Sequence, residues 1–468
     1  MDKVKPAHGV SYRYRIHGAT RHKKMKPFLT LSLALLLAIS GSSQNPFVTD
    51  QFTADPTARV FGDRVYVYPS HDIPCTPTRG RVGWFCMQDY HVFSSPDLTN
   101  WTDHGVIVSQ DQVSWVDTAS YSMWAPDCVM HRGKYYFYFP ARTKDTLYGK
   151  GFAIGVAISD HPVGPFAIEP APIRGVSGID PNVFIDHDGQ AYLYWAAKEI
   201  FVAKLKDNML ELDTSPQVIP NLPDVGLKEG PFVFERNGIY YLTYPHVENK
   251  TERLEYAIAD NPLGPFVVKG VIMKESPECW TNHQSIVQFK DQWYLFYHFN
   301  DLSPDFDKNR SIRIDKLFFN ADGTIQEVTP TLRGVGITPA NSSIQIDRYS
   351  QISDQGVHPE FLDSTNRFAG WKIQLSRANA WIRYNDVDFG KGLLQSVRVS
   401  GRSESGGKLS IYLDQRNGPE IGQITIPAGK DWATLEAQIK TGITGIHHLI
   451  IQSLGNNTIE LDWIQFQE

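Results

Sequence analysis

The sequence predicts an all-β protein, in which a five-bladed β-propeller is followed by a β-sandwich (jelly-roll) domain. Three observations support this prediction. A turn followed by an aromatic strand recurs five times in the first two thirds of the chain, helical periodicity is nearly absent, and short strands of alternating hydrophobicity fill the last part.

The chain begins with a segment typical of a secretion signal. Residues 25–43, "MKPFLTLSLALLLAISGSS", combine a basic start, an apolar stretch and small residues at the end. We interpret residues 1–43 as a signal peptide with an upstream extension, and we expect a periplasmic or secreted protein with no membrane anchor. This segment holds eight Lys or Arg and one Asp, so the rest of a chain with formal net charge −6 is strongly acidic. An acidic body argues against nucleic acid as a partner, because nucleic-acid binding needs clustered positive charge.

Five repeats define the first domain, residues 44–335. They read "GDRVYVYPSHD", "RGKYYFYFPAR", "DGQAYLYWAAK", "NGIYYLTYPHV" and "KDQWYLFYHFN". The aligned tyrosines are separated by 70, 56, 49 and 53 residues; they are Tyr66, Tyr136, Tyr192, Tyr241 and Tyr294. Each unit has room for about four strands with turns, which is the size of one propeller blade.

Polar residues recur at one position before these tyrosines. Asp55 and His283 precede their tyrosines by 11 residues, and Asp180 and Glu229 precede theirs by 12. Because the first strand of each blade lines the central channel, we expect these side chains to converge at one end of the axis. The alternative is that the carboxylates only cap turns at the entries of strands.

Carboxyl groups gathered in one pocket suit the cleavage of a glycosidic bond. One must be protonated to donate to the leaving oxygen, and another must be ionised to activate water or attack carbon. Burial or a neighbouring negative charge raises the pKa of the donor. The longer Glu229 suits the donor, and Asp55 and Asp180 suit the base and the modulator. We expect Lys228 to point away from Glu229, because neighbouring residues in a strand face opposite sides.

The motifs around these residues resemble glycoside hydrolase family 43. They are "TADPTARVFGDRVYVYPSHD", "MWAPD", "GIDPNVFID", "KEGPFVF" and "TNHQSIV", and they follow the family's order between residues 46 and 335. The resemblance implies an inverting, exo-acting hydrolase that removes arabinofuranosyl or xylosyl residues from plant polysaccharide such as arabinoxylan or arabinan. It implies Asp55 as general base, Glu229 as general acid and Asp180 as pKa modulator and orienter, with no cofactor required for the chemistry.

Several alternatives stay open beside the favoured α-L-arabinofuranosidase. The chain could be a β-xylosidase or a galactan-active member of the same family. It could also be a non-catalytic glycan-binding propeller protein, although the intact acidic trio argues against this. Fructan-cleaving enzymes share the propeller and carry a Glu-Cys pair, but here Glu278 of "PECW" lies outside the acidic register and the "WxNxPNG" opening is absent.

Further residues of the propeller are candidate substrate contacts, namely Trp124, Asp127, Phe232, His283 and Arg310. By the family resemblance, His283 lies at the propeller centre, where some members place a calcium ion or its water, and Arg310 lies near the substrate. Each has a structural alternative: His283 could be a hydrogen-bonded core histidine, Arg310 a surface charge, and Trp124 and Phe232 packing residues.

The four cysteines fit an exported protein. Cys75 and Cys86 bracket a loop-like stretch, so a local disulfide is plausible. Cys128 and Cys279 are either a second pair or two buried thiols, and we favour buried thiols. No Cys-x-x-Cys or His-rich metal spacing is present in the sequence.

The second domain begins after a predicted linker, residues 336–343, "GITPANSS". Residues 344–468 contain six short alternating strands, which indicates a β-sandwich. The segments "WIRYNDVDFG", "IGQITIP", "GIHHLIIQ" and "LDWIQF" resemble a family 6 carbohydrate-binding module. We therefore expect a plant polysaccharide or oligosaccharide as the partner, and a monomer.

The module resemblance also implies binding residues. A structural calcium would be held by Gln345, Asp347 and Asp462, although the first two replace glutamates of the family pattern. Trp371 and Trp432 are candidate sugar-stacking residues, with core packing as the alternative. Asn456 is a candidate hydrogen-bonding partner of the sugar beside these two tryptophans.

Overall fold

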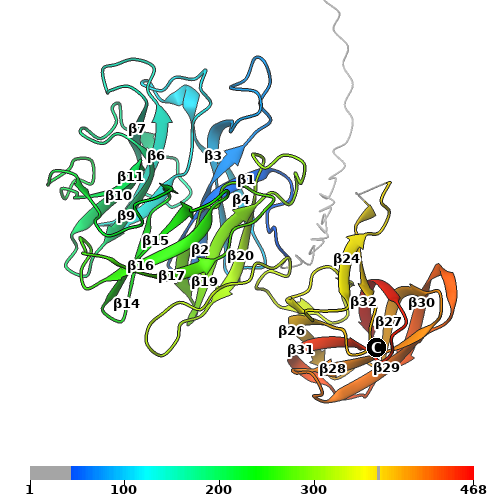
Figure 1. Ribbon diagram of the computed structural model, residues 1–468. Helices are drawn as coiled ribbons and strands as arrows, with labels where there is room; N and C mark the ends of the chain where they lie inside the picture. The colour runs from blue at the N-terminus through cyan, green and yellow to red at the C-terminus, as the bar shows by residue number, and fades with distance from the viewer. Residues whose placement is uncertain (1–43, 366–368) are drawn as a thin grey trace, which may run out of the picture. The chain divides into compact units, whose positions relative to one another are not determined.

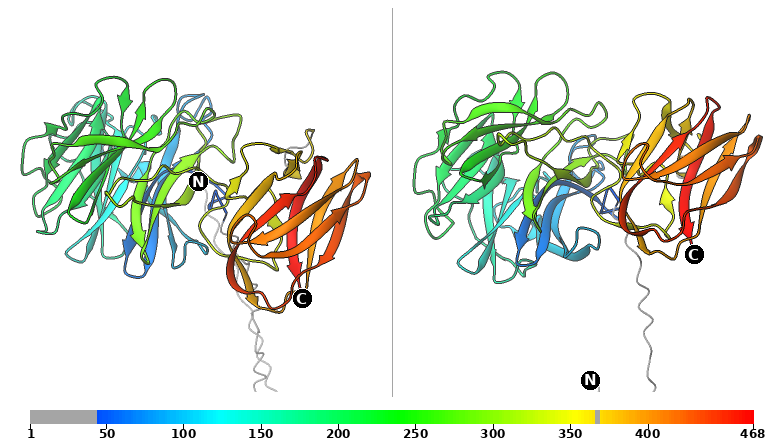
Figure 2. Two further views of the ribbon diagram at one scale, coloured as in Figure 1. Left: turned by 60° about the horizontal axis from the view of Figure 1, so that its bottom comes forward. Right: turned by 90° about the horizontal axis from the view of Figure 1, so that it is seen from below.

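A computed structural model describes residues 44–365 and 369–468, so the predicted signal peptide lies outside the described residues. In the described part, regular structure is β-strand apart from one 3₁₀ turn, Gln110–Gln112, and strands make up both domains in the views of Figure 2. No helix in these ranges is long and apolar enough to cross a membrane. The prediction of an all-β protein is therefore confirmed.

Five antiparallel sheets follow one another along the first part of the chain (Figure 1). The first three have four strands each: β1 (Phe52–Phe61), β2 (Arg64–Asp72), β3 (Met87–Ser95) and β4 (Thr102–Ser109); β5 (Asp127–His131), β6 (Lys134–Arg142), β7 (Phe152–Ser159) and β8 (Ala167–Ile168); β9 (Ile179–Ile185), β10 (Ala191–Ala197), β11 (Glu199–Lys204) and β12 (Gln217–Val218).

The last two sheets depart from the expected four strands. The fourth has five: β13 (Leu227–Lys228), β14 (Phe232–Arg236), β15 (Ile239–Val247), β16 (Arg253–Ala259) and β17 (Val267–Met273). The fifth has three: β18 (Ser285–Phe289), β19 (Gln292–Phe299) and β20 (Ser311–Leu317). The aromatic strand of each repeat is the second long strand of its sheet, as the turn pattern predicts.

The first long strands of the five sheets contact one another in a closed ring. β1 contacts β5, β5 contacts β9, β9 contacts β14, β14 contacts β18, and β18 contacts β1. Apolar clusters lie between neighbouring sheets, including the first and last, where Val67 and Phe93 pack with Phe296 and Ile312. This closure makes the first domain a five-bladed propeller, and it brings the recurring polar positions to one axis.

The remaining strands form two six-stranded sheets around one apolar core, which confirms the predicted β-sandwich. One sheet contains β21 (Thr338–Pro339), β23 (Gln351–Ile352), β26 (Trp381–Lys391), β28 (Gly407–Leu413), β29 (Glu420–Ile426) and β31 (Thr444–Ser453). The other contains β22 (Ile344–Gln345), β24 (Val357–Phe361), β25 (Trp371–Leu375), β27 (Ser396–Ser403), β30 (Gly429–Gln438) and β32 (Ile459–Gln467).

The segment predicted as a linker, residues 336–343, is part of the sandwich. Thr338 and Pro339 form β21, which pairs in parallel with β26, and Ala340 is fully buried in the core of this domain. The composition of small and polar residues suggested a free linker, but backbone pairing and burial of one small side chain fix the segment. The module therefore begins earlier than the sequence predicts.

The cysteines are arranged as predicted. Cys75 and Cys86 form a disulfide, and Cys128 and Cys279 are buried free thiols. The disulfide closes the loop before β3, and this loop carries Trp84 and Phe85.

Candidate active site

The three predicted acidic residues line one small cavity of about 110 Å³: Asp55 from β1, Asp180 from β9, and Glu229 from the turn before β14. Asp55 and Asp180 have left-handed backbone, with φ of 47° and 57°, and each lies at a break in the pairing register of its strand. Such bulges turn a side chain out of the regular alternation. The same local distortion in two blades therefore aims both carboxyl groups into the cavity.

Asp55 is held in its ionised form. One carboxylate oxygen accepts a hydrogen bond from Arg310 Nη1 at 2.7 Å, and the other accepts one from Ser70 Oγ at 2.7 Å. Burial alone raises the pKa of Asp55, but the charges of Arg310, His298 and His283 outweigh it and lower the pKa to about 2. The group is therefore a carboxylate at neutral pH.

Arg310 is in turn fixed by Asp72 at the end of β2. The Nε and Nη2 atoms of Arg310 each donate to Asp72 at 2.9 Å, and its backbone N–H donates to the same carboxylate at 2.8 Å. The arginine side chain is 3% exposed. It is therefore a buried bridge between two carboxylates and not a surface charge.

Glu229 and two neighbouring acids are placed to hold protons. Burial is the largest cause that raises the pKa of Asp180, Glu229 and Glu252. Negative charges nearby add to it: those of Glu229 and Asp55 for Asp180, that of Asp55 for Glu229, and those of Glu229 and Asp180 for Glu252. Asp180 accepts a hydrogen bond from the N–H of Gly230 at 2.9 Å. Glu252 hydrogen-bonds the side chain of Glu229, which partly offsets the rise in the pKa of Glu229. One cavity thus combines an ionised carboxylate with carboxyl groups that favour the neutral form.

Aromatic side chains form a wall of the cavity. Trp124 lines it as predicted, together with Trp84, Phe85 and Trp280. The rings of Phe85 and Trp280 are stacked with centroids 6.0 Å apart, and the Arg310 guanidinium lies 4.8 Å from the Phe85 ring centre. Flat apolar rings beside buried carboxyl groups suit the face of a sugar.

The wall and the supporting acids include residues that the repeat pattern does not identify. Trp84, Phe85 and Trp280 lie in loops, and Glu252 directly precedes β16, so none shares the register of the acidic trio. Two features of the sequence could have pointed to these surroundings of the trio: the cysteines that bracket the Trp84 loop, and Asp72 at the end of the first repeat.

Two predicted substrate contacts lie outside the cavity, and their expected roles are corrected. Asp127 is fully buried, binds Arg59 Nη2 at 2.6 Å, and accepts the N–H of Val183 at 2.6 Å. Phe232 is 2% exposed and packs in the core between the fourth and fifth blades, 4.9 Å from the Arg59 guanidinium. In the repeat alignment, both residues come two or three positions after the one that holds an acid in other blades. There the strand alternates regularly again, so these side chains point into the blade and not into the cavity.

The other charged residues near the motifs are accounted for. His283 and Arg310 line the cavity. The Lys228 side chain is 2% exposed, lies 3.7 Å from Glu199 and does not line the cavity, so it points away from Glu229 as expected. Glu278 is exposed and likewise lies outside the cavity.

The residues around His283 do not fit a calcium ion. Its Nδ1 atom lies 3.8 Å from an oxygen of Asp55 that already accepts a hydrogen bond from Arg310. Calcium takes about six to eight oxygen ligands. Within residues 44–365 and 369–468, one group of His, Cys, Asp or Glu side chains has three ligand atoms within 4.8 Å of one another, and that group does not include His283.

The predicted calcium ligands of the module are only partly brought together. The backbone N–H of Ile346 donates to the carbonyl of Asp462, and the charge of Asp347 contributes, after burial, to a raised pKa of Asp462. Asp347 lies 3.4 Å from the Arg348 guanidinium, and Gln345 is exposed. Two carboxylates beside a guanidinium are a poor set of ligands for calcium.

The structure does not gather the predicted glycan-binding residues of the module. Trp371 on β25 is 39% exposed and stacks on Phe361 with centroids 4.2 Å apart. Trp432 lies on β30, with β32 and β27 between the two strands, and its ring is 5.1 Å from the Arg402 guanidinium. Asn456 accepts a hydrogen bond from the N–H of Ala378.

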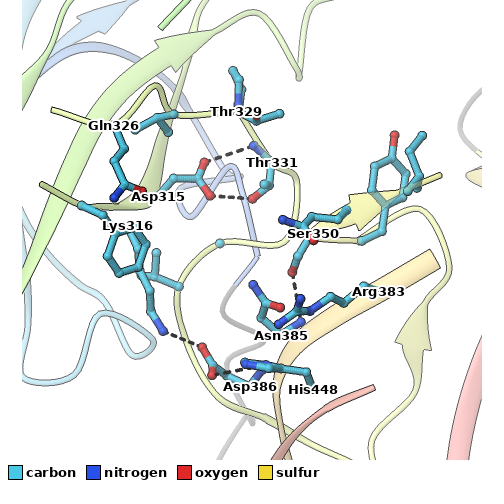
Figure 3. Close-up of a pocket in the computed structure, with 18 of the residues that line it drawn as sticks. Asp315, Lys316, Gln326, Thr329, Thr331, Ser350, Arg383, Asn385, Asp386 and His448 are labelled. Carbon is cyan, nitrogen blue, oxygen red and sulfur yellow. Dashed lines mark hydrogen bonds and ion pairs between the residues drawn. The ribbon is translucent and has the colours of Figure 1, made fainter. Parts of the chain in front are cut away.

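A larger hollow of about 890 Å³ lies elsewhere and is lined by none of Asp55, Asp180 and Glu229 (Figure 3). Two of its acids are already engaged: Lys316 binds Asp386 at 2.7 Å, and Asp315 accepts hydrogen bonds from the hydroxyl and N–H of Thr331 (Figure 3). Acid–base chemistry is therefore assigned to the smaller cavity.

Comparison with known families agrees with this division of the chain. Residues 43–325 match the family model described as glycosyl hydrolases family 43, and residues 353–468 match the carbohydrate binding module (family 6).

Named relatives cover either the first domain or nearly the whole chain. A xylosidase/arabinosidase 43A of Humicola insolens is 36% identical over 61% of this chain and 99% of its own length. An arabinoxylan arabinofuranohydrolase of Bacillus subtilis is 26% identical over 95% of this chain and 99% of its own length.

Solved structures give the same result. A β-xylosidase/α-arabinofuranosidase of family 43 from a compost microbial metagenome, in complex with xylotriose, has a TM-score of 0.55 at 36% identity, over 62% of this chain and 98% of its own. A family 43 arabinoxylan arabinofuranohydrolase from Bacillus subtilis, in complex with cellotetraose, has a TM-score of 0.52 at 26% identity, over 92% of this chain and 98% of its own.

Proposed function

This chain belongs to glycosyl hydrolases family 43 and carries a C-terminal family 6 carbohydrate-binding module, and we propose that it is an exo-acting, inverting α-L-arabinofuranosidase. Its substrate would be a plant cell-wall polysaccharide such as arabinoxylan or arabinan, or an oligosaccharide derived from one. The observation that carries this proposal is the pairing of an ionised Asp55 with a Glu229 of raised pKa in one cavity.

The two carboxyl groups divide the reaction between them. Glu229 donates its proton to the glycosidic oxygen as the bond to the anomeric carbon breaks. Asp55 accepts a proton from a water molecule, which attacks the anomeric carbon from the opposite face and inverts its configuration. For that water to fit, we expect the two carboxyl groups to be about 6.5–9.5 Å apart.

Asp180 supports the acid and does not exchange protons with the substrate in this scheme. Its carboxyl group accepts the N–H of Gly230, the residue that follows Glu229, so it fixes the turn that carries the acid. A negative charge on Asp180 would also raise the pKa of Glu229. By these two effects Asp180 would orient the acid and modulate its pKa.

The size of the cavity supports action on a terminal sugar. Its volume of about 110 Å³ is well below the roughly 300–1,000 Å³ of sites that enclose larger ligands. One pentose ring against the aromatic wall would fill it, which favours release of single residues over cleavage within a chain.

A β-xylosidase is the second candidate, because a β-xylosidase of Xylanibacter ruminicola is 33% identical to this chain, close to the 36% of the xylosidase/arabinosidase of Humicola insolens. Initial rates on p-nitrophenyl α-L-arabinofuranoside, β-D-xylopyranoside and β-D-galactopyranoside decide between the candidates. We expect the arabinofuranoside to give the highest kcat/KM. A higher value for the xyloside would make xylosidase the main activity, and binding of arabinoxylan without turnover of any substrate would overturn the catalytic proposal.

We also propose that the protein acts outside the cytoplasm. The basic and apolar pattern of residues 25–43 and the Cys75–Cys86 disulfide support this, because disulfides persist in oxidising compartments. Cell fractionation with antibody detection tests it, and recovery of the protein in the cytoplasmic fraction alone would contradict it.

A further inference from the structure

The first blade carries a group of histidines and an aspartate that the proposed reaction does not use. His71 comes from β2, and Asp89 and His91 come from β3. One candidate ligand atom from each residue lies within 4.8 Å of the other two. The three side chains are 19%, 17% and 15% exposed, so an ion could reach them without opening the fold.

Local backbone geometry brings these side chains together. Asp89 and His91 are two residues apart on β3 and therefore project from the same face of the sheet. The pairing of β2 with β3 breaks register here: Ser70 pairs with Tyr90 and Asp72 with Met87, so β3 bulges at Asp89 and His71 lies opposite the bulge. Bulges re-aim side chains, and here the Nδ1 atom of His71 comes to 2.7 Å from an oxygen of Asp89.

A fourth residue orients one of the histidines. His91 Nδ1 lies 3.0 Å from both carboxylate oxygens of Asp103. Asp103 is itself held by the N–H of Gly105 at 2.7 Å and by Gln51 at 3.1 Å. A carboxylate next to Nδ1 keeps the ring proton on Nδ1 and leaves the lone pair of Nε2 free to bind a metal. Metal-binding histidines are commonly oriented in this way by a second residue.

We propose that His71, Asp89 and His91 bind a zinc ion, with Asp103 as the residue that orients His91 and with water completing the coordination. Imidazole nitrogen with one carboxylate oxygen is a ligand set that zinc favours, at about 2.0–2.2 Å from the metal. Ligand atoms on a tetrahedral ion of that size are about 3.3 Å apart, so atoms already within 4.8 Å need only side-chain rotation.

A bound zinc ion would cross-link β2 and β3 next to the residues that hold Asp55 in the active site. His71 directly precedes Asp72, which fixes Arg310 and through it Asp55. Because an ion that binds only the folded chain stabilises it by mass action, zinc should raise the melting temperature of the propeller. This effect requires no turnover and is independent of the proposed glycosidase activity.

Titration calorimetry of the metal-stripped full chain, free of any histidine tag, with zinc chloride tests the proposal. We expect a site that is lost in the double variant His71→Ala/His91→Ala and weakened roughly 10- to 100-fold in Asp103→Asn. His131→Ala is the matched control, because His131 is also largely buried (10% exposed) and faces a carboxylate, that of Asp207, outside the group. This control should bind zinc as the unaltered chain does.

Two results would overturn the zinc site: no zinc binding by the unaltered chain, or equal binding by the unaltered chain and the double variant. If circular dichroism shows that the double variant does not fold, anomalous scattering at the zinc edge from zinc-soaked crystals of the unaltered chain decides. A peak between His71, Asp89 and His91 supports the site, and its absence there contradicts it.

Discussion

Asp55 and Glu229 line the same cavity, yet their pKa values shift in opposite directions. Asp55 receives the guanidinium of Arg310, so its pKa falls to about 2 despite burial. For Glu229, burial and the negative charge of Asp55 outweigh the hydrogen bond from Glu252 and the charge of Arg310, so its pKa rises. At the scale of the residue, the position of one arginine thus separates the roles of base and acid.

Replacing the proton donor should slow the reaction selectively. In Glu229→Gln we expect kcat on arabino-oligosaccharides to fall by about 10²–10⁴-fold, because positioned general acids contribute on that order. Substrates with an activated aryl leaving group need less protonation and should lose less. The exposed Glu275 provides the control, as Glu275→Gln should leave kcat unchanged. Equal losses on both substrate types would contradict the donor role.

Glu252, the neighbour of Glu229, should control the pH at which activity falls on the alkaline side of the pH profile. Activity requires protonated Glu229, so kcat/KM should fall as pH rises through its raised pKa. Glu252 donates a hydrogen bond that lowers the pKa of Glu229. Glu252→Ala removes this donor and should move the limb to higher pH, whereas Glu252→Gln keeps an N–H donor and should leave the limb in place. A shift to lower pH in Glu252→Ala would refute this.

The lowered pKa of Asp55 also predicts the direction in which the stability of the folded chain changes with pH. Its ionisation contributes stability in full above the ordinary pKa of 3.8, and this contribution is lost as pH falls toward about 2. Thermal melts between pH 5 and pH 2 should show a smaller fall in melting temperature for Asp55→Asn than for the unaltered chain. An identical fall in both would contradict the assignment.

At the scale of the element, a bulge repeated between blades builds the site. Asp55 in β1 and Asp180 in β9 share left-handed backbone and a register break, which explains why both could be predicted by aligning repeats. Glu252 and Trp280 have no counterparts in other blades, and their places depend on how loops pack in three dimensions. The repeat pattern therefore predicts which acids share the cavity, but it does not predict the residues that surround them.

The same alignment misplaced Asp127, which the structure makes a structural residue. Removing its charge leaves the guanidinium of Arg59, which is 16% exposed, without its ionic partner, and breaking a buried ion pair typically costs about 3–5 kcal/mol. Asp127→Asn should therefore lower the melting temperature of the propeller while the folded protein keeps its kcat within about twofold. Asp207→Asn, which breaks an exposed pair with Arg132, should change stability by about 0–1 kcal/mol. A large loss of kcat without loss of stability would return Asp127 to the active site.

At the scale of the whole molecule, the chain joins a catalytic propeller to a sandwich whose family binds carbohydrate. Both domains could be predicted from strand patterns, because alternation and turns are local properties of sequence. The boundary could not, since the segment around Ala340 is defined by pairing with β26, which lies much later in the chain.

The module's contribution should appear in binding and not in turnover. In Trp371→Ala we expect retention on insoluble arabinoxylan to weaken by roughly 2- to 10-fold, because aromatic stacking contributes about 0.5–1.5 kcal/mol. The comparison is Trp432→Ala, whose ring lies against Arg402 and should matter less. Both variants should hydrolyse a small aryl glycoside at the normal rate. Equal retention by Trp371→Ala and the unaltered chain would exclude this tryptophan from glycan binding.

If Asp55 activates water directly while Glu229 protonates the leaving group, hydrolysis must invert the anomeric configuration. Proton NMR during the first minutes of hydrolysis identifies the anomer that is released before mutarotation. From an α-L-arabinofuranoside, we expect β-L-arabinofuranose to form first. Initial release of the α anomer would show retention through a covalent intermediate and would refute direct attack by water.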